Sequence, residues 1–241
     1  MRTRDRIIKA SIELFNAQGE RHVTTNHIAA HLGISPGNLY YHFRNKEDII
    51  RNIFEEYTHH LEQHVVQPPR NEDPIESVAQ YLDSVFELMW KFHFFYANLP
   101  DLLSRDEVLQ KNYQEFQLRL LERVVSLIQG LKRAKIIQID EEDILDFAHT
   151  IKLTVTFWVS YIRTQDPHAT INQATIYQGV QKVLLLFKPY VTIEAKARIQ
   201  EFEKRFAALA NEVDLTDNDA VEADALKTNS ADIQPEQERQ G

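Results

Sequence analysis

Cysteine is absent from the 241-residue chain, which excludes disulfide bonds, a thiol nucleophile and a cysteine-ligated metal. Only 6 glycines and 8 prolines are present, so long helices are favoured over a turn-rich β fold. The longest apolar run, residues 183–187, is far shorter than the roughly 20 residues that cross a membrane. The N-terminal segment also lacks the continuous apolar stretch of a signal peptide. We therefore expect a helical, cytoplasmic protein with no membrane partner.

Patterns typical of enzymes are missing as well. The sequence contains no Gly-rich phosphate loop, no paired-carboxylate cleft pattern and no Ser-His-Asp arrangement. The pairs His27/His31 and His60/His64 have a spacing that can chelate zinc, but no third and fourth ligand accompanies them. We predict a protein that is not an enzyme and has no cofactor and no metal site. A helical enzyme and a helical scaffold remain as alternatives.

Charge is distributed unevenly along the chain. The net charge of −9 argues at first against a nucleic-acid partner. Residues 211–241, however, carry 2 Lys/Arg against 9 Asp/Glu, whereas residues 1–50 carry 7 against 5 together with four histidines. Binding depends on local charge, so the mildly basic N-terminal fifth remains compatible with DNA. We expect the acidic tail to be disordered and solvating, with competition for the basic segment as the alternative.

Apolar residues recur with helical spacing through most of the chain. Thr24, Ser35 and Asn45 are suited to cap three successive helices, and Gly33 is suited to end the first of them. We predict a break around Pro68-Pro69 and a short turn or a single helical turn at 99–104. The predicted long helices span residues 4–18, 75–97, 106–131, 141–164, 172–188 and 193–210. The predicted fold class is therefore all-α.

The stretch "SPGNLYYHFRNKEDI", residues 35–49, predicts a short helix with an exposed polar face. At about 100° per residue, Leu39 and Phe43 share one face and must pack inward, which turns Tyr41 outward. With the preceding helix it forms a helix-turn-helix, and its length of about 10 Å fits a major groove about 12 Å wide. The alternative is a solvated short helix, but exposed tyrosines without a partner are unfavourable.

The segment "TTNHIAAHLGISPGNLYYHFRNKEDII" resembles the DNA-binding signature of the tetracycline-repressor (TetR) family of bacterial transcriptional regulators. The match runs from about Thr3 to Tyr57 and includes "RIIKASIELFNAQG". The resemblance implies an N-terminal helix-turn-helix DNA-binding domain followed by a larger helical ligand-binding and dimerisation domain. It also implies that the DNA-contacting residues are Thr25, Asn26, Ser35, Gly37, Asn38, Tyr40, Tyr41, His42 and Lys46, with Thr25 and Lys46 on phosphates.

After residue 60 the resemblance to the family lies in the arrangement of the helices rather than in the identity of individual residues. Residues 141–164 and 172–188 are apolar on more than one face, which predicts that both helices pair with a second copy in a homodimer. Gly179 would allow close approach at that interface. The alternative is that both helices are buried within a monomer. A monomer, however, would present only one helix-turn-helix to a palindromic operator.

Aromatic and polar residues of the central helices are candidates for the lining of an effector pocket. Aromatic residues in helices are more often part of the core, whereas buried polar residues require partners and are more informative. The expected effector is an apolar or amphipathic small molecule. The candidates are Trp90, His93, Phe94, Asn98, Tyr113, Phe116, His149, Thr154, Trp158 and Tyr161.

The sequence as a whole predicts four regions. Residues 1–50 form the DNA-binding domain, with the helix-turn-helix at about 24–43, and residues 51–190 form the effector-binding and dimerisation domain. Residues 191–210 add a C-terminal helix, and residues 211–241 form the acidic tail. The predicted function is that of a sequence-specific repressor that a small-molecule effector releases from double-stranded operator DNA. An activator of the same family is the alternative.

Overall fold

The computed structural model describes residues 2–63, 73–166 and 169–208, and these residues are almost entirely helical. The short 3-10 helices are η1 (Glu20–His22) and η3 (Lys188–Tyr190), and residues 196–208 form a further helix. The α-helices are α1 (Thr3–Gln18), α2 (Thr25–Leu32), α3 (Pro36–His42), α4 (Lys46–Leu61), α5 (Pro74–Lys91), α6 (His93–Arg105), α7 (Glu107–Arg133), α8 (Ile144–Gln165) and α9 (Gln173–Phe187). The predicted Pro68-Pro69 break and the acidic tail lie outside the described residues.

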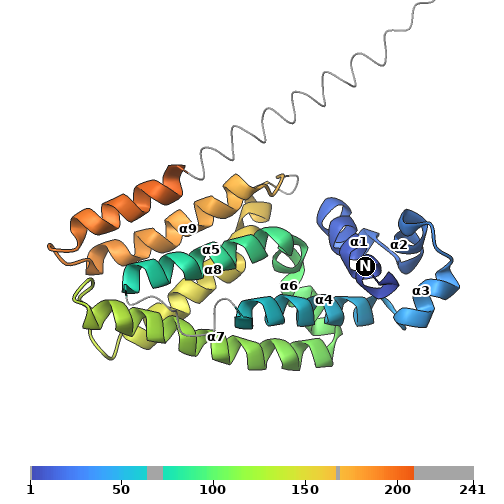
Figure 1. Ribbon diagram of the computed structural model, residues 1–241, viewed down its shortest axis with the longest axis horizontal. Helices are drawn as coiled ribbons and strands as arrows, with labels where there is room; N and C mark the ends of the chain where they lie inside the picture. Colours follow the sequence, from blue (N-terminus) through green and yellow to red (C-terminus); the bar gives the residue numbers. More distant parts are fainter. Residues whose placement is uncertain (1, 64–72, 167–168, 209–241) are drawn as a thin grey trace, which may run out of the picture.

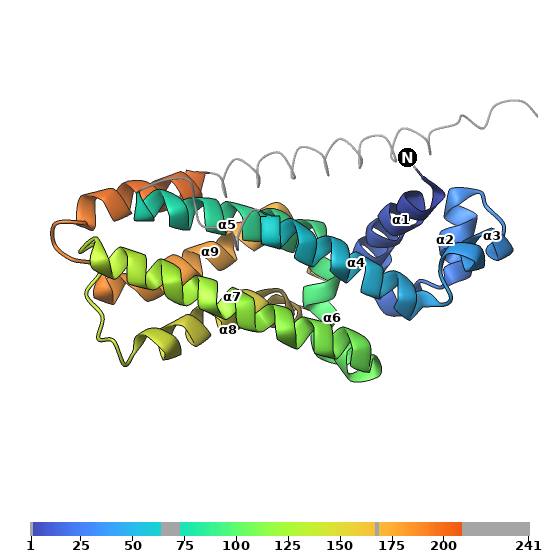
Figure 2. The same cartoon turned by 60° about the horizontal axis from the view of Figure 1, so that its bottom comes forward.

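The molecule is elongated, with a small head at one end of a larger helical body (Figure 1). Helices α1–α3 form the head, and α3 lies at the end farthest from the body in both views (Figure 2). Helix α4 begins in the head and runs into the body, where it packs on α5 and α7. One continuous apolar core includes Phe15 and Leu39 in the head, Phe54 on α4 and Phe116 in the body. The fold class is all-α, as predicted.

Local capping explains the geometry of the head. The Thr24 hydroxyl accepts a hydrogen bond from the backbone N–H of His27, and the Ser35 hydroxyl accepts one from that of Asn38. Gly33 ends α2 with φ of +65°, a left-handed conformation that glycine adopts without strain. Pro36 occupies the first turn of α3, where its missing N–H is harmless. These contacts fix the angle between α2 and α3.

The predicted single helix over residues 75–97 is wrong, because α5 ends at Lys91 and α6 begins at His93. Phe92 has a non-helical backbone conformation at the break. The Asn16 side chain of α1 satisfies both sides of it, donating to the Lys91 carbonyl at 2.9 Å and accepting from the Phe94 N–H at 3.0 Å. The break is therefore stabilised by a residue about 75 positions earlier, which the local helical period does not reveal.

Residues 99–104, predicted as a short turn or a single helical turn, are helical and form the part of α6 after its kink. Helix α6 kinks at Asn98 and contains Pro100, which cannot donate a hydrogen bond to the carbonyl four residues earlier. That carbonyl belongs to Tyr96, and it accepts a hydrogen bond from the Ser160 hydroxyl of α8 at 2.9 Å. A side chain from a neighbouring helix thus compensates for the proline.

Candidate DNA interface and the joint behind it

Helix α3 presents an exposed polar face at the tip of the head. Leu39 and Phe43 are buried, as their spacing predicts, and the Tyr41 side chain is 85% exposed. Tyr40 is half exposed, and its hydroxyl lies 2.9 Å from the Thr25 hydroxyl of α2. This hydrogen bond positions the Tyr40 ring between the two helices.

The remaining predicted DNA-contacting residues of the head surround Tyr41. Asn26, Ser35, Gly37 and Asn38 are exposed, whereas His42 is partly exposed and meets the Tyr41 ring edge-on at 5.1 Å. A Cβ at Gly37 would have no atom closer than 4.0 Å, so the absence of a side chain there leaves open space beside the helix. The head therefore brings together hydroxyl, amide and imidazole groups that suit phosphates and base edges.

Lys46 lies at the start of α4, as predicted, but its ammonium is engaged within the protein. Its Nζ lies 2.8 Å from Glu20 Oε1 and donates to the Glu20 main-chain carbonyl at 2.9 Å. The Lys46 side chain is only 19% exposed, and the Glu20 side chain is fully buried. A phosphate contact by Lys46 therefore requires the ammonium to exchange or share its carboxylate partner.

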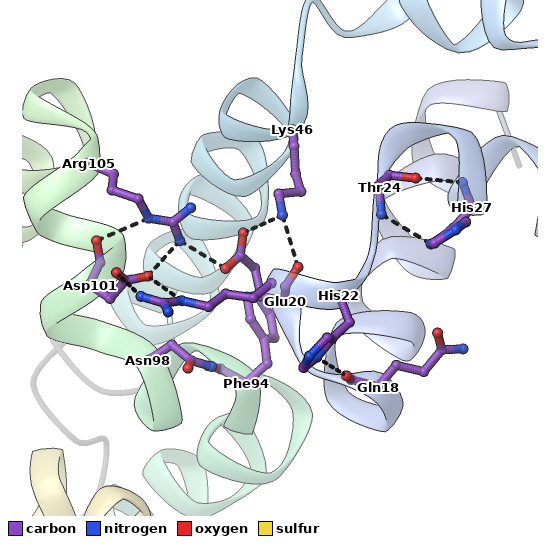
Figure 3. Close-up of polar contacts among 11 residues, drawn as sticks. Gln18, Glu20, His22, Thr24, His27, Lys46, Phe94, Asn98, Asp101 and Arg105 are labelled. Atoms are coloured by element: carbon purple, nitrogen blue, oxygen red, sulfur yellow. Dashed lines mark hydrogen bonds and ion pairs between the residues drawn. The ribbon is translucent and has the colours of Figure 1, made fainter.

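Glu20 is the centre of a charged cluster between head and body (Figure 3). On its other side it accepts a hydrogen bond from Arg105 at the end of α6, at 2.9 Å. Arg105 also pairs with Asp101, which in turn pairs with Arg21 of η1. Hydrogen bonding to Arg21, with a further contribution from Arg105, lowers the pKa of the Asp101 carboxyl. We call Glu20, Arg21, Lys46, Asp101 and Arg105 the joint cluster.

Further contacts connect the head and α4 to the body. Asn16 bridges the α5–α6 break, and Phe15 beside it packs against Phe94 with ring centroids 5.2 Å apart. On α4, Arg51 pairs with Asp106, the residue that caps α7 through two backbone N–H groups. A displacement of α6 or α4 would therefore also move the head.

An enclosed cavity of about 20 Å³ lies between α4, α5, α6, α7 and α8 in the body. Of the predicted pocket residues, only Tyr113 lines it. Burial raises the pKa of Tyr113 to about 12, although a hydrogen bond with Thr156 acts in the opposite direction. The cavity also contains Lys152 of α8, a residue that the sequence analysis did not single out.

Two predicted pocket residues lie in a different place. Trp90 and His93 line an open groove of about 650 Å³ between α1 and the body, together with Arg163. Burial lowers the pKa of His93, whose Nδ1 lies 2.8 Å from the Trp90 carbonyl. This groove and the enclosed cavity are separate sites.

Three others are packing or structural residues. Phe94 and Phe116 are fully buried in the core, and Asn98 donates to the Phe94 carbonyl at the kink of α6. Phe116 nevertheless supports the cavity, because its ring packs edge-on against that of Tyr57, a lining residue.

The four predicted pocket residues on α8 do not line the cavity. His149 is exposed, and the Thr154 hydroxyl donates to a carbonyl of its own helix. Trp158 packs on α9, where its Nε1–H donates to the Thr175 carbonyl at 2.7 Å, and Tyr161 stacks beside it. A Cβ at Gly179 would lie 2.7 Å from the Trp158 ring. Gly179 thus allows a close approach within the chain, where the sequence analysis expected one between subunits.

Helices α8 and α9 carry exposed apolar side chains. Leu153, Phe157 and Tyr161 recur every four residues along α8 and are 61%, 41% and 54% exposed. Leu185 on α9 is likewise exposed. Such a stripe on two adjacent helices is typical of a protein–protein interface.

None of the helices in the described part of the chain is both long and apolar enough to cross a membrane. Across the same residues, no three His, Asp or Glu side chains are grouped so that they could hold a metal ion.

Comparison with known proteins agrees with the DNA-binding interpretation of the head. Residues 7–53 match the family described as bacterial regulatory proteins of the tetR family, and residues 56–199 match the family described as bacterial transcriptional repressor. A TetR-family transcriptional regulator from Marinobacter aquaeolei VT8, known from its crystal structure, is 40% identical to this chain in sequence. The two structures superimpose with a TM-score of 0.78. That alignment covers 86% of this chain and 99% of the other.

Curated relatives match more locally. The HTH-type transcriptional regulator SrpR of Pseudomonas putida is 38% identical over 60 residues, which is 25% of this chain and 28% of the relative. The biofilm operon icaADBC HTH-type negative transcriptional regulator IcaR of Staphylococcus epidermidis is 26% identical over 159 residues. That match covers 64% of this chain and 81% of IcaR.

The fold and the matches define a helix-turn-helix, DNA-binding transcriptional regulator, and the relatives are regulators rather than enzymes. The chain belongs to the TetR family. Proteins of this family bind operator DNA and dimerise, and small-molecule effectors are typical of them.

Sequence reasoning missed three residues that the structure makes prominent. Glu20 and Asn16 join head to body, yet no local pattern in the sequence marks either residue. Lys152 did give one, because it is the only charged residue between Ile151 and Ile162 in an otherwise apolar or uncharged stretch of α8. A single lysine in such a run is worth noting as a candidate ligand contact.

Proposed function

We propose that the protein is a homodimeric repressor that acts in the cytoplasm and leaves its palindromic operator when a small molecule enters the core cavity. The observation that carries this proposal is the exposed face of α3, with Tyr41 projecting from a helix held by two buried residues. In each subunit, α3 enters the major groove of one half-site, with the predicted DNA contacts Thr25, Asn26, Ser35, Gly37, Asn38, Tyr40, Tyr41, His42 and Lys46.

The exposed stripe of α8 and α9 supports the dimer. Two copies related by a twofold axis would bury Leu153, Phe157 and Tyr161 against the same helices of the partner in a four-helix interface. Phe157→Glu places a charge in that interface, so we expect the dimer to become a monomer in sedimentation analysis. Leu118→Glu on α7, which is also exposed, is the control and should remain dimeric. A dimeric Phe157→Glu protein would refute this interface.

Enclosure favours the core cavity as the effector site. A larger groove, of about 710 Å³ and lined by residues from the segments 132–139 and 192–198, is open to solvent and lies at the end of the body away from the head. An enclosed, largely apolar site removes more of a small ligand from water than an open groove does. Helix α4 also supports this choice, because it carries Tyr57 and Leu61 at the cavity and Lys46 at the joint cluster.

Effector release is then a population shift. An effector that binds better to an expanded cavity would displace the end of α4 and, through the joint cluster, change the angle of the head. The two recognition helices of the dimer would no longer match the spacing of the half-sites. Binding to DNA would weaken by as much as the effector prefers the expanded form.

A footprint on the DNA flanking the protein's own gene tests the proposal. We expect two protected half-sites on one face of the duplex, about 34–36 Å or a multiple of this apart. A transcriptional reporter driven by the same DNA should rise when the protein is removed. A fall would make the protein an activator, and the absence of any footprint together with an unchanged reporter would refute operator binding there.

A further inference from the structure

Lys152 is a cation inside the core cavity without a carboxylate partner among the described residues. It projects from α8, and its Nζ donates to the Gln117 main-chain carbonyl of α7 at 2.7 Å. An ammonium group has three N–H donors, and this is one hydrogen bond. Burial lowers the pKa of Lys152 to about 8, so the group is still mostly protonated at neutral pH. A partly desolvated cation in this position is stabilised by an added anion.

Tyrosine hydroxyls surround the same cavity. The hydroxyls of Tyr57 and Tyr96 lie 2.6 Å apart, and Tyr81 and Tyr113 contribute two more. Burial raises the pKa of Tyr57, Tyr81 and Tyr96, so these groups are neutral at physiological pH and carry O–H donors, one of which the Tyr57–Tyr96 hydrogen bond uses. Among the residues that the structure describes, no acidic side chain lines the cavity. Its polar groups therefore suit a negative charge.

The rest of the lining is apolar and aromatic. Leu61, Val85 and Phe95 belong to it, and the Phe95 ring stacks on that of Phe54 behind it, with centroids 5.5 Å apart. Such a surface binds hydrocarbon or aromatic groups by removing them from water. The two kinds of lining define a ligand with one charged end and an apolar remainder.

We infer that the core cavity binds a small anion, a carboxylate or similar oxyanion on an apolar body, and that Lys152 pairs with its negative group. This inference rests on the proposed function of the cavity as the effector site. A cation or a neutral apolar compound would leave Lys152 without its partner. Lys152 therefore determines which chemical class of effector the regulator detects.

The size of the cavity connects binding to regulation. Its volume of about 20 Å³ accommodates little more than one water molecule, so a ligand must displace lining side chains. Tyr57 and Leu61 are among them, and both lie on the last turns of α4. We therefore expect binding of the anion to move the end of the helix that begins at the joint cluster.

Three probes with one aromatic body test the inference, namely 2-naphthoate, 2-naphthylmethanol and 2-naphthylmethylammonium. Isothermal titration calorimetry on the full chain without DNA should show that 2-naphthoate binds at least 10-fold more tightly than the other two. Lys152→Met should remove that preference and leave the affinity for 2-naphthylmethanol equal or higher. Lys111→Met, an exposed lysine on α7, is the matched control and should keep the preference.

Two results would overturn the inference. One is a wild-type protein that binds the neutral or cationic probe as well as 2-naphthoate, or binds none of the three. The other is a folded Lys152→Met protein that retains the preference for 2-naphthoate. Operator binding is measured separately by electrophoretic mobility shift with and without each probe. If 2-naphthoate binds through Lys152 but leaves the DNA complex intact, the inference holds and the proposed effector release fails.

Discussion

The head and the body of this regulator hold their functional side chains in opposite ways. In the head, the residues proposed to contact DNA project into solvent from helices fixed by caps and buried anchors, with Tyr41 outside and Leu39 inside. In the body, the cavity is almost closed by the side chains that would contact a ligand. The proposed recognition surface is thus formed before its partner arrives, whereas the proposed effector site must be opened. A preformed surface and a closed cavity joined by one helix are what a ligand-controlled DNA-binding protein needs.

The largest expected effect concerns the connection between the two regions. Glu20→Ala removes the buried carboxylate between Lys46 and Arg105 and leaves both cations without it. Removing one partner of a buried ion pair costs about 3–5 kcal/mol of unfolding free energy. Urea denaturation measures the loss. Glu13→Ala, which removes an exposed pair with Lys9, is the control and should cost less than about 1 kcal/mol. Equal losses would show that the joint cluster is no stronger than the surface pair.

The next effect isolates the preformed surface. Tyr41→Ala should reduce operator affinity by about 10- to 100-fold, the equivalent of about 1–3 kcal/mol for one good contact to DNA. Because Tyr41 is exposed, the midpoint of thermal unfolding should stay unchanged. Fluorescence anisotropy with labelled operator DNA measures the affinity, and Leu118→Ala on α7 serves as the control. Wild-type affinity in Tyr41→Ala would remove this residue from the interface.

A smaller effect, a gain in stability rather than a loss, is expected from a substitution in the cavity. Lys152→Met replaces a partly buried cation by an apolar side chain of similar length, so the ligand-free protein should become more stable by about 1 kcal/mol. For a protein of this size that corresponds to about 2–4 °C in the melting temperature by differential scanning calorimetry. Lys111→Met should change it by much less. A lower melting temperature for Lys152→Met would mean that the ammonium contributes to the fold.

The smallest effect is a pH dependence at the boundary of head and body. Burial lowers the pKa of His93 below its usual 6.5, with the nearby Arg163 charge acting in the same direction. The unfolded chain therefore binds a proton more readily, and this residue's contribution to stability decreases as the pH falls through about 6.5. His93→Gln should flatten that part of the stability profile, measured by urea denaturation between about pH 5 and 8. An unchanged slope would exclude His93 as its source.

Local signals in the sequence were sufficient for the head. Thr24, Ser35 and Gly33 act within three or four residues of themselves, so the helices and the exposed face of α3 could be predicted from spacing alone. The same signals failed at the α5–α6 break, because Asn16 stabilises it from α1. Nor do they reveal the contact at Pro100, where Ser160 of α8 supplies the missing donor.

The cavity was the least predictable region. Aromatic residues at helical spacing do not reveal which ring faces a cavity and which fills the core, and of the proposed pocket residues only Tyr113 lines the cavity. Lys152 stood out by its charge in an apolar run, a signal of chemistry rather than of periodicity. In a helical body, then, the exceptional residue is a better guide to a ligand site than the aromatic majority.

The positions of the two tryptophans give the molecule built-in spectroscopic reporters. Trp90 stacks on His93 beside the α5–α6 break, and Trp158 lies against Gly179 between the helices that carry the exposed stripe. The sequence contains no other tryptophan, so Trp158→Phe leaves an emission signal from the head–body boundary alone. Trp90→Phe leaves one from the α8–α9 contact. The arrival of a ligand and the rearrangement of subunits could thus be followed separately by the intrinsic fluorescence of the two variants, without attaching a dye.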